Sequence, residues 1–389
     1  MLYEKPIVIA GGGIAGLTAA LALAQQKFKV LVLEKASKFQ EVGAGVQLSP
    51  NATCILENIG ILKQCKQKGV VPDNILMIDG HNFSTLTKLP IRKYTTDNNL
   101  SDYITIHRAD LHCILHEASI DNHNISIKMN CQNISYEKKG VNNYLVKFND
   151  TTLESSMVIA ADGIWSKLRK GNEANFSGNV AWRTTIDKKD FAHLFPTLTS
   201  ANVYAILGSD NHIIIYPISD NKLYNIIAVT NGSTDMAKYD SKETRAFLSK
   251  SFTKWSANIQ QVLQTIPNWT IWPLFYMPYT KLANEDKIIF IGDAAHGFLP
   301  YAAQGACMAI EDAGELADIS PKILSGDSAA LNRFIANRHS RIEKVRKRGD
   351  FNSFVFHASG VTRVSRNIAL KIIAPNMLLK RLDWLYNFR

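Results

Sequence analysis

The chain has 389 residues, of which 46% are hydrophobic and 20% are charged, and its formal net charge is +10. This composition is typical of a globular protein, and the length favours two connected domains with a helical tail. No apolar run is long enough to cross a bilayer and no secretory signal precedes the first predicted strand, so we expect neither a membrane span nor export.

The five cysteines are scattered and never occur as Cys-x-x-Cys, which argues against a disulfide framework or a metal site. We therefore expect a reducing compartment, with the cytoplasm as the default. Basic residues gather between Arg333 and Arg389. They indicate either a solvated basic face or a surface that meets anionic lipid or acidic partners. Nucleic acid is not an expected partner, because no nucleic-acid-binding signature accompanies the charge.

The N-terminal region predicts a strand, a glycine turn, a helix and a second strand. Residues 6–10 and 29–34 are short apolar runs, and residues 14–26 carry apolar side chains at helical spacing. This order is typical of a βαβ unit in a buried parallel sheet.

A GxGxxG motif occupies the turn of this unit. Gly11 permits the tight turn, Gly13 lets a pyrophosphate approach the backbone at the helix N-terminus, and Gly16 lets helix and strand pack closely. Glu34 ends the second strand, where a carboxylate can accept hydrogen bonds from a ribose. The motif predicts dinucleotide binding without separating FAD from NAD. The residues that we assign to this function are Gly11, Gly13, Ile14, Ala15, Gly16, Glu34 and Lys35.

The middle of the chain predicts a second, mostly antiparallel sheet on the substrate side. A helix opened by Asn51 precedes short strand patterns over residues 71–96. From residue 178 to 278 apolar runs alternate with Asn, Asp and Gly turns, interrupted by one amphipathic helix over residues 241–251.

The chain is therefore expected to weave between two domains of an α/β fold. A three-layer Rossmann-type domain takes residues 1–70, 100–177 and 280–325, and an interleaved sheet domain takes residues 71–99 and 178–279. Residues 326–389 form a C-terminal helical region.

Two further strand ends carry a glycine–aspartate pair. Residues 157–161 lead into Asp162-Gly163, and residues 288–291 lead into Gly292-Asp293. Either pair alone is typical of a strand-end turn with a helix cap. Together with the GxGxxG motif and Glu34, they closely resemble the three fingerprints of the class A flavoprotein monooxygenases, along residues 7–348. That family includes para-hydroxybenzoate, salicylate and 3-hydroxybenzoate hydroxylases and ubiquinone-biosynthesis hydroxylases.

The resemblance implies FAD as the cofactor and NADH or NADPH as a transient reductant. It also implies that one atom of O2 passes through a flavin hydroperoxide to a small aromatic or similarly electron-rich substrate. Glu34 would bind the adenosine ribose, Arg108 the FAD phosphate or ribityl region, and Asp293 the ribityl side of the flavin. Pro300 would lie against the isoalloxazine ring. The two glycine–aspartate pairs would add Asp162, Gly163 and Gly292 to the FAD site.

Two glycine-containing segments suit a flat ring for physical reasons. The N–H groups of Gly305 and Ala306, at a predicted helix start, can face the flavin pyrimidine edge, because a helix N-terminus favours the negative charge of reduced flavin. The loop of residues 43–47, with Gly45 and Val46, permits close approach of the ring, and its alternative interpretation is a flexible connection.

A predicted strand carries the candidate for proton handling. His212, Ile214 and Tyr216 share one face of it. A histidine can accept the proton of a phenol near neutrality, and similar hydroxybenzoate hydroxylases place a His and a Tyr at this spacing beside the substrate. We predict His212, Tyr216 and Pro300 as catalytic, with packing in the sheet as the alternative for the first two. Some of those hydroxylases carry Gln in place of Pro300, which leaves a hydroxybenzoate substrate unsupported.

Three alternatives stay open. The same fingerprints occur in flavin-dependent dehydrogenases and reductases that transfer no oxygen, and a non-catalytic flavin-binding module is a further reading. The third alternative is the same hydroxylation on a quinone precursor, with the basic C-terminal region and apolar residues such as Ile372 and Trp384 resting on the inner face of a membrane. We expect a monomer or a homodimer.

Overall fold

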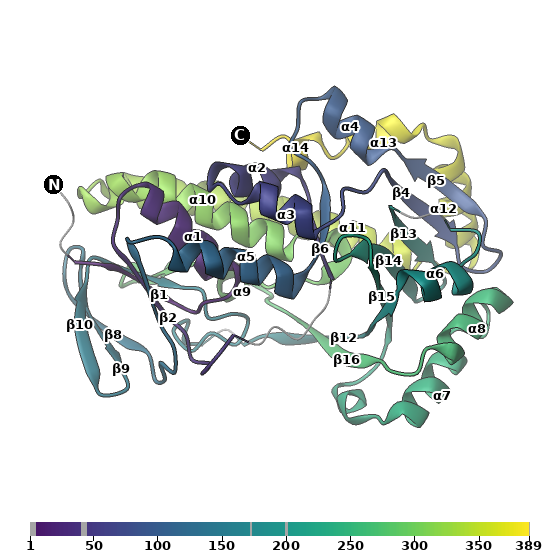
Figure 1. The fold of residues 1–389 in the computed structure, drawn as a ribbon, viewed down its shortest axis with the longest axis horizontal. Coiled ribbons are helices and arrows are strands. Elements are labelled where there is room, and N and C mark those ends of the chain that lie inside the picture. The colour runs from purple at the N-terminus through teal and green to yellow at the C-terminus, as the bar shows by residue number, and fades with distance from the viewer. Residues whose placement is uncertain (1–4, 40–44, 172, 199–200, 389) are drawn as a thin grey trace.

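The computed structural model describes residues 5–39, 45–171, 173–198 and 201–388 (Figure 1). It contains a parallel sheet, a larger mixed sheet and a helical C-terminus. The predicted α/β fold class is confirmed. Within the described residues, none of the helices combines the length and apolar character that crossing a bilayer requires.

Five parallel strands form the first sheet, in the order β17-β11-β1-β2-β7. Their bounds are Ile7–Ala10 for β1, Val30–Leu33 for β2, Ile125–Lys128 for β7, Met157–Ala160 for β11 and Ile289–Phe290 for β17. Every residue of β1, β2 and β11 is buried, because both faces of the sheet are covered. Strand β17 is shorter than predicted, because the sequence indicated a strand over residues 288–291.

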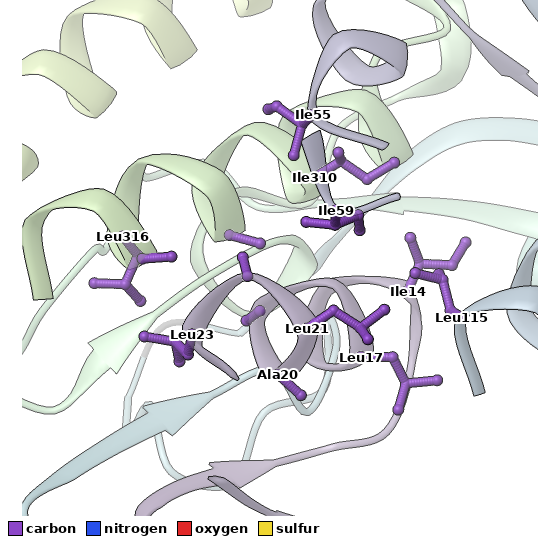
Figure 2. Packing of buried hydrophobic residues seen from close by; sticks show 14 of the residues in the cluster. Ile14, Leu17, Ala20, Leu21, Leu23, Ile55, Ile59, Leu115, Ile310 and Leu316 are labelled. Carbon is purple, nitrogen blue, oxygen red and sulfur yellow. The ribbon is translucent and has the colours of Figure 1, made fainter. Parts of the chain in front are cut away.

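Helices cover one face of this sheet. Helix α1 (Ile14–Gln25) packs between α5 (Arg108–Ile120) and α10 (Gly305–Leu324), and α2 (Pro50–Asn58) and α3 (Leu62–Lys68) extend the layer. Apolar residues surround helix α1, as expected for a helix that is buried between other elements. Figure 2 shows its buried side chains, Leu17 and Leu23 among them, beneath Ile310 and Leu316 of α10.

A small antiparallel sheet covers the opposite face. It has the order β10-β9-β8, with bounds Ser135–Gly140 for β8, Asn143–Phe148 for β9 and Thr151–Ser155 for β10. Val8 and Leu31 of the parallel sheet pack with Val146 and Phe148 of β9. Helices, parallel sheet and small sheet make the three layers expected from the sequence.

Seven strands form the second large sheet, in the order β16-β12-β15-β14-β13-β4-β5, antiparallel except for the pair β13 and β4. The prediction of a mostly antiparallel sheet is confirmed. The bounds are Asn74–Asp79 for β4, Thr85–Leu89 for β5, Asn175–Asp187 for β12, Asn202–Leu207 for β13, His212–Ile218 for β14, Leu223–Asn231 for β15 and Thr270–Tyr276 for β16. Strands β3 (Gly45–Leu48) and β6 (Ile104–His107) form a separate pair.

Three local predictions are wrong. The single helix expected beside this sheet is α7 (Ser241–Ser251), but α6 (Lys188–Leu194), α8 (Ala257–Thr265) and the 3-10 turn η1 (Thr234–Lys238) accompany it. Residues expected as strand form α4 (Ile91–Asp97). Helix α2 begins at Pro50, because the fixed φ of proline suits a first helical turn, and Asn51 lies inside it.

The C-terminal region is helical, as predicted. Its bounds are Ser328–Phe356 for α11, Gly360–Ile372 for α12, Pro375–Lys380 for α13 and Asp383–Tyr386 for α14. Between the parallel sheet and α10 lie the short helix α9 (Asp293–His296) and the 3-10 turn η2 (Pro300–Ala302). Figure 1 shows α12 and α13 beside β5, at the end of the molecule away from the parallel sheet.

Candidate active site

The glycine turn joins β1 to α1, and two of its glycines are required by close packing. Gly11 has φ +108°, and a Cβ on it would lie 2.4 Å from the carbonyl oxygen of Ala161. A Cβ on Gly16 would lie 1.9 Å from the carbonyl oxygen of Gly11. At Gly13 a Cβ would meet nothing within 4 Å, so this glycine borders open space at the helix N-terminus.

Two side chains brace the turn. The Glu34 carboxylate accepts hydrogen bonds from the N–H of Gly12 at 2.7 Å and of Ala36 at 2.9 Å. On α5, Nε2 of His112 lies 2.7 Å from the carbonyl oxygen of Gly12. Lys35, next to Glu34, is exposed. Sequence reasoning missed His112, because it contacts the turn across a hundred residues of chain.

A cleft of about 340 Å³ extends from the glycine turn toward the seven-stranded sheet. It brings together residues from all three predicted fingerprints and from β14. The predicted site residues that line it are Gly13, Ile14, Ala15, Gly45, Val46, Arg108, Gly163, His212, Tyr216, Asp293, Pro300, Gly305 and Ala306. The predicted residues outside its lining are Gly11, Gly16, Glu34, Lys35, Asp162 and Gly292. Residues 43 and 44 of the predicted flavin loop lie outside the described residues.

Gly292 lets the second glycine–aspartate pair approach the helices. It has φ +59°, and a Cβ on it would lie 3.0 Å from Cβ of Ala15 and 3.2 Å from Cβ of Ala309. Its N–H donates to the carboxylate of Asp312 on α10 at 2.8 Å. His296, at the end of α9, contacts the same carboxylate oxygen through Nε2 at 2.5 Å. The pair is thus tied to the middle of α10.

A buried ionic cluster lies behind this turn. Arg338 of α11 donates through Nε to Asp312 at 2.9 Å and through Nη1 to Glu311 at 2.7 Å. Arg341 adds two bonds to Glu311, each 2.6 Å. Burial favours the protonated form of Asp312, but His296 and Arg338 outweigh it and hold the pKa of this carboxyl below its usual value.

Asn51 joins this cluster instead of capping a helix. Its amide donates to Glu311 at 2.5 Å and to Gln304 at 3.1 Å, and the Gln304 amide in turn donates to the Ser49 hydroxyl at 2.8 Å. The start of α2 and the start of α10 are therefore held together by hydrogen bonds beneath the cleft.

Strand β14 supplies the far wall of the cleft. Tyr216 is buried against Gly45, where a Cβ would lie 2.4 Å from its ring, and the Gly45 N–H donates to the Asn225 side chain at 3.1 Å. Burial raises the pKa of the Tyr216 hydroxyl, and the nearby Arg183 offsets only part of this effect. The ring of Tyr216 therefore keeps its proton at neutral pH.

His212 is paired with His357, which follows α11 and which sequence reasoning missed. Nδ1 of His212 lies 2.9 Å from Nε2 of His357. Burial lowers the pKa of His357 to about 4, and burial together with His357 lowers the pKa of His212 well below its usual value. Both rings are neutral near pH 7, and one proton lies between them. Nε2 of His212 is left for other contacts.

A second cavity of about 490 Å³ adjoins the cleft, between the seven-stranded sheet, η2 and the C-terminal helices. The residues that line both spaces are Gln47, His212, Ile214, Pro300 and Ala303. The remaining walls are mainly apolar, with Met77, Val203 and Leu370 as examples. Arg348 of α11 enters this cavity, and its buried Nε has no hydrogen-bond partner among the described residues. Its guanidinium lies over the ring of Phe351.

Residues 4–348 match the model of a family described as "FAD binding domain". The chain belongs to this family. The 3-hydroxybenzoate 6-hydroxylase 1 of Aquipseudomonas alcaligenes is 29% identical over 385 residues, which are 98% of this chain and 97% of that protein. The 6-hydroxynicotinate 3-monooxygenase of Bordetella bronchiseptica is also 29% identical, over 88% of this chain and 91% of its own length.

Several solved structures have the same fold as this chain. Klebsiella pneumoniae HpxO complexed with FAD and uric acid has a TM-score of 0.86 at 19% identity, over 100% of this chain and 98% of that chain. A salicylate hydroxylase substrate complex has a TM-score of 0.78 at 21% identity, over 100% and 97%. The predicted membership of the class A FAD-dependent monooxygenases is confirmed, and so are FAD as the cofactor and an oxidoreductase activity.

The cleft fits FAD in three respects. Gly13 leaves open space at the N-terminus of α1, where a pyrophosphate is favoured. Arg108 and Arg183 line the same cleft, and the buried Nε of Arg183 has no hydrogen-bond partner among the described residues. Next to the cleft, between its lining residues Ala161 and Gly163, Oδ1 of Asp162 is buried and has no hydrogen-bond partner among the described residues. These donors and acceptors suit a bound group with phosphates and hydroxyls.

Proposed function

We propose that this FAD-dependent monooxygenase uses NADH or NADPH and O2 to hydroxylate a small aromatic or other electron-rich molecule. The observation that carries the proposal is the wall shared by the cleft and the apolar cavity, formed by His212, Ile214 and Pro300. A substrate ring in the cavity would meet a cofactor in the cleft at this shared boundary. The aromatic substrates in the names of two relatives agree with this class.

Bound FAD would supply hydride acceptance and O2 activation, and the chain would bind, orient and exclude water. Gly11, Gly13, Ile14, Ala15 and Gly16 would hold the pyrophosphate, and Glu34 and Lys35 the adenosine side. The rest of the proposed cofactor site comprises Gly45, Val46, Arg108, Asp162, Gly163, Gly292, Asp293, Gly305 and Ala306. Several of these are held in place by contacts outside the cleft, such as the bond from Gly292 to Asp312.

His212 is the proposed proton acceptor. Its lowered pKa keeps it neutral at pH 7. In the tautomer in which the Nδ1–H of His212 donates to Nε2 of His357, Nε2 of His212 carries a free lone pair and would accept the proton of a phenolic substrate. Tyr216 would stay protonated and donate a hydrogen bond. Pro300, at the start of η2, would lie against the isoalloxazine ring of the flavin.

The test uses purified, FAD-loaded protein with NADH or NADPH and a panel of phenols under 18O2. We expect faster NAD(P)H oxidation with one class of phenol, and one 18O atom in the product. His212→Gln should lower the rate with phenols and retain bound FAD. Peroxide without oxygenated product would instead favour the dehydrogenase or reductase alternative, and a flavin that NAD(P)H cannot reduce would favour a non-catalytic module.

A second candidate function is the same hydroxylation of a lipophilic precursor at a membrane surface. The large apolar cavity favours it, because a hydroxybenzoate would leave much of about 490 Å³ unfilled. Cytoplasmic location, a monomeric or homodimeric state and the domain limits stay predictions.

A further inference from the structure

The C-terminal helices carry an unusual share of the exposed apolar surface. Among the described residues, thirteen large apolar side chains are exposed, and eight of them lie between Phe351 and Trp384. These eight are Phe351, Phe354, Val361, Val364, Ile368, Ile372, Met377 and Trp384. Scattered exposed apolar residues need no explanation, but a concentration on consecutive helices marks an interaction surface.

Helix α12 exposes its apolar face, whereas a helix on the surface of a globular protein usually exposes its polar face. Val361, Val364, Ile368 and Ile372 follow each other at spacings of three and four residues, so they form one stripe, and they are between 50% and 83% exposed. Two of its three charged residues point inward instead. Arg363 donates to Asp79 of β4 at 2.8 Å, and the buried Arg366 donates to the carbonyl oxygen of Val355 at 3.0 Å.

Exposed cations lie on α12 itself and at the end of the next helix, α13. Lys371, Lys380 and Arg381 are exposed, and the structure gives none of them a carboxylate partner within the described residues. Between Phe351 and Phe388 the chain has a single acidic residue, Asp383. We name the α12 stripe, together with Lys371 on the same helix and the exposed Lys380 and Arg381 at the end of α13, the docking face.

The charge selects among possible partners. A second copy of the chain would bring the same uncompensated cations against each other, whereas an anionic lipid surface offers both negative headgroups and an apolar region. The net charge of +10 acts in the same direction. A bilayer surface is therefore the partner that complements both properties of the docking face.

The docking face also adjoins the second cavity. Phe351 and Phe354 are more than half exposed, and both line that cavity, so they form part of its rim. The inner side of α12, through Ala369 and Leu370, lines it too. One helix layer thus separates the cavity from the outer surface.

We propose that the docking face rests on an anionic lipid bilayer, with its apolar side chains in the interfacial region and its cations at the lipid phosphates. This arrangement puts the rim of the apolar cavity at the membrane surface, so that a lipophilic molecule passes between bilayer and cavity without crossing water. The inference supplies the membrane contact on which the second candidate function rests, and it does not depend on which reaction the bound flavin carries out.

The experiment measures sedimentation of the FAD-loaded protein with vesicles of phosphatidylglycerol and phosphatidylcholine in equal parts, and with phosphatidylcholine alone. One variant carries Ile368→Asp and Ile372→Asp, and a second carries Lys371→Gln and Lys380→Gln. The control is Val141→Asp, because Val141 is 82% exposed in the β8–β9 turn, at the opposite end of the molecule (Figure 1). Flavin content and circular dichroism establish that each variant is folded.

We expect the wild type and Val141→Asp to bind the anionic vesicles equally, and binding to weaken with added salt. The aspartate pair should lower the partition coefficient by at least about tenfold. Removing two cations should lower it by about fivefold per charge. Equal binding of the wild type and the aspartate variant would overturn the proposal, as would a wild type that ignores anionic vesicles.

A second measurement separates the competing occupant. If the wild type fails to bind vesicles and light scattering finds a dimer that Ile368→Asp with Ile372→Asp converts to monomer, the face joins two copies and the membrane proposal is wrong. Vesicle binding is scored without NAD(P)H or substrate. A failure of the hydroxylase assay would therefore leave this result unaffected, and the reverse also holds.

Discussion

Asp312→Asn tests the buried cluster behind the second glycine–aspartate pair. Asp312 accepts hydrogen bonds from the Gly292 N–H, from His296 and from Arg338. The side chains of Asp312, His296 and Arg338 are fully buried. An asparagine has one acceptor oxygen and no charge, so it cannot satisfy all three donors. Arg338 would keep Glu311 but lose a buried counter-charge.

Breaking a buried ion pair by removing one partner costs about 3–5 kcal/mol. A domain of ordinary stability has about 5–15 kcal/mol in total, so the loss is a large fraction of it. The substitution should also weaken FAD binding, because the hydrogen bond from the Gly292 N–H to Asp312 fixes the turn beside the cleft. We therefore expect Asp312→Asn to lower the free energy of unfolding by at least about 3 kcal/mol and to reduce the FAD content after purification.

Urea unfolding of the FAD-free and FAD-loaded protein measures both effects. The matched control is Asp318→Asn, on the same helix but exposed, which should change the free energy of unfolding by less than about 0.5 kcal/mol. A change below about 1 kcal/mol in Asp312→Asn would show that the cluster is replaceable and refute the reasoning.

Three further results are expected. Gly13→Leu should fold normally by circular dichroism and bind no FAD, because its side chain enters the open space at the α1 N-terminus. Gly16→Leu should fail to fold, because a side chain there meets the carbonyl oxygen of Gly11. FAD retained in Gly13→Leu would contradict the proposed pyrophosphate site. Folding lowers the pKa of His357 to about 4 and the pKa of His212 well below its usual value, so below pH 6.5 the unfolded chain binds more protons than the folded chain. Stability is therefore lost as the pH is lowered from 6.5, by up to about 1.4 kcal/mol per pH unit for each histidine. His357→Phe should flatten this slope in urea titrations, and an unchanged slope would exclude the pair as its cause. Arg348→Met should raise the melting temperature, because it removes a buried donor without a partner, which costs about 1–3 kcal/mol; a lower melting temperature would show that the guanidinium is satisfied.

The parts of the site that could be predicted are those coded by neighbouring residues. Gly11, Gly13 and Gly16 each answer a local demand for a tight turn or close packing, so their spacing carries the geometry. The alternation that puts His212 and Tyr216 on one cleft wall is likewise local to β14.

The supporting contacts could not be predicted, because they join distant segments. Asp312 meets Arg338 across two helices, and His212 meets His357 across 145 residues. No spacing rule links such pairs, and neither His112 nor His357 belongs to a motif. The short helices α4 and α6 were missed for another reason, since seven residues make fewer than two turns and show little periodicity.

The order of the strands in the parallel sheet has a consequence for synthesis on the ribosome. Strand β17 lies at one edge of that sheet although it begins only at Ile289, and Arg338, which closes the buried cluster, comes later still. A nascent chain that has emerged through residue 280 has the glycine turn but lacks the second glycine–aspartate pair. The complete cofactor site therefore cannot assemble until at least about three-quarters of the chain, residue 293 of 389, has been translated.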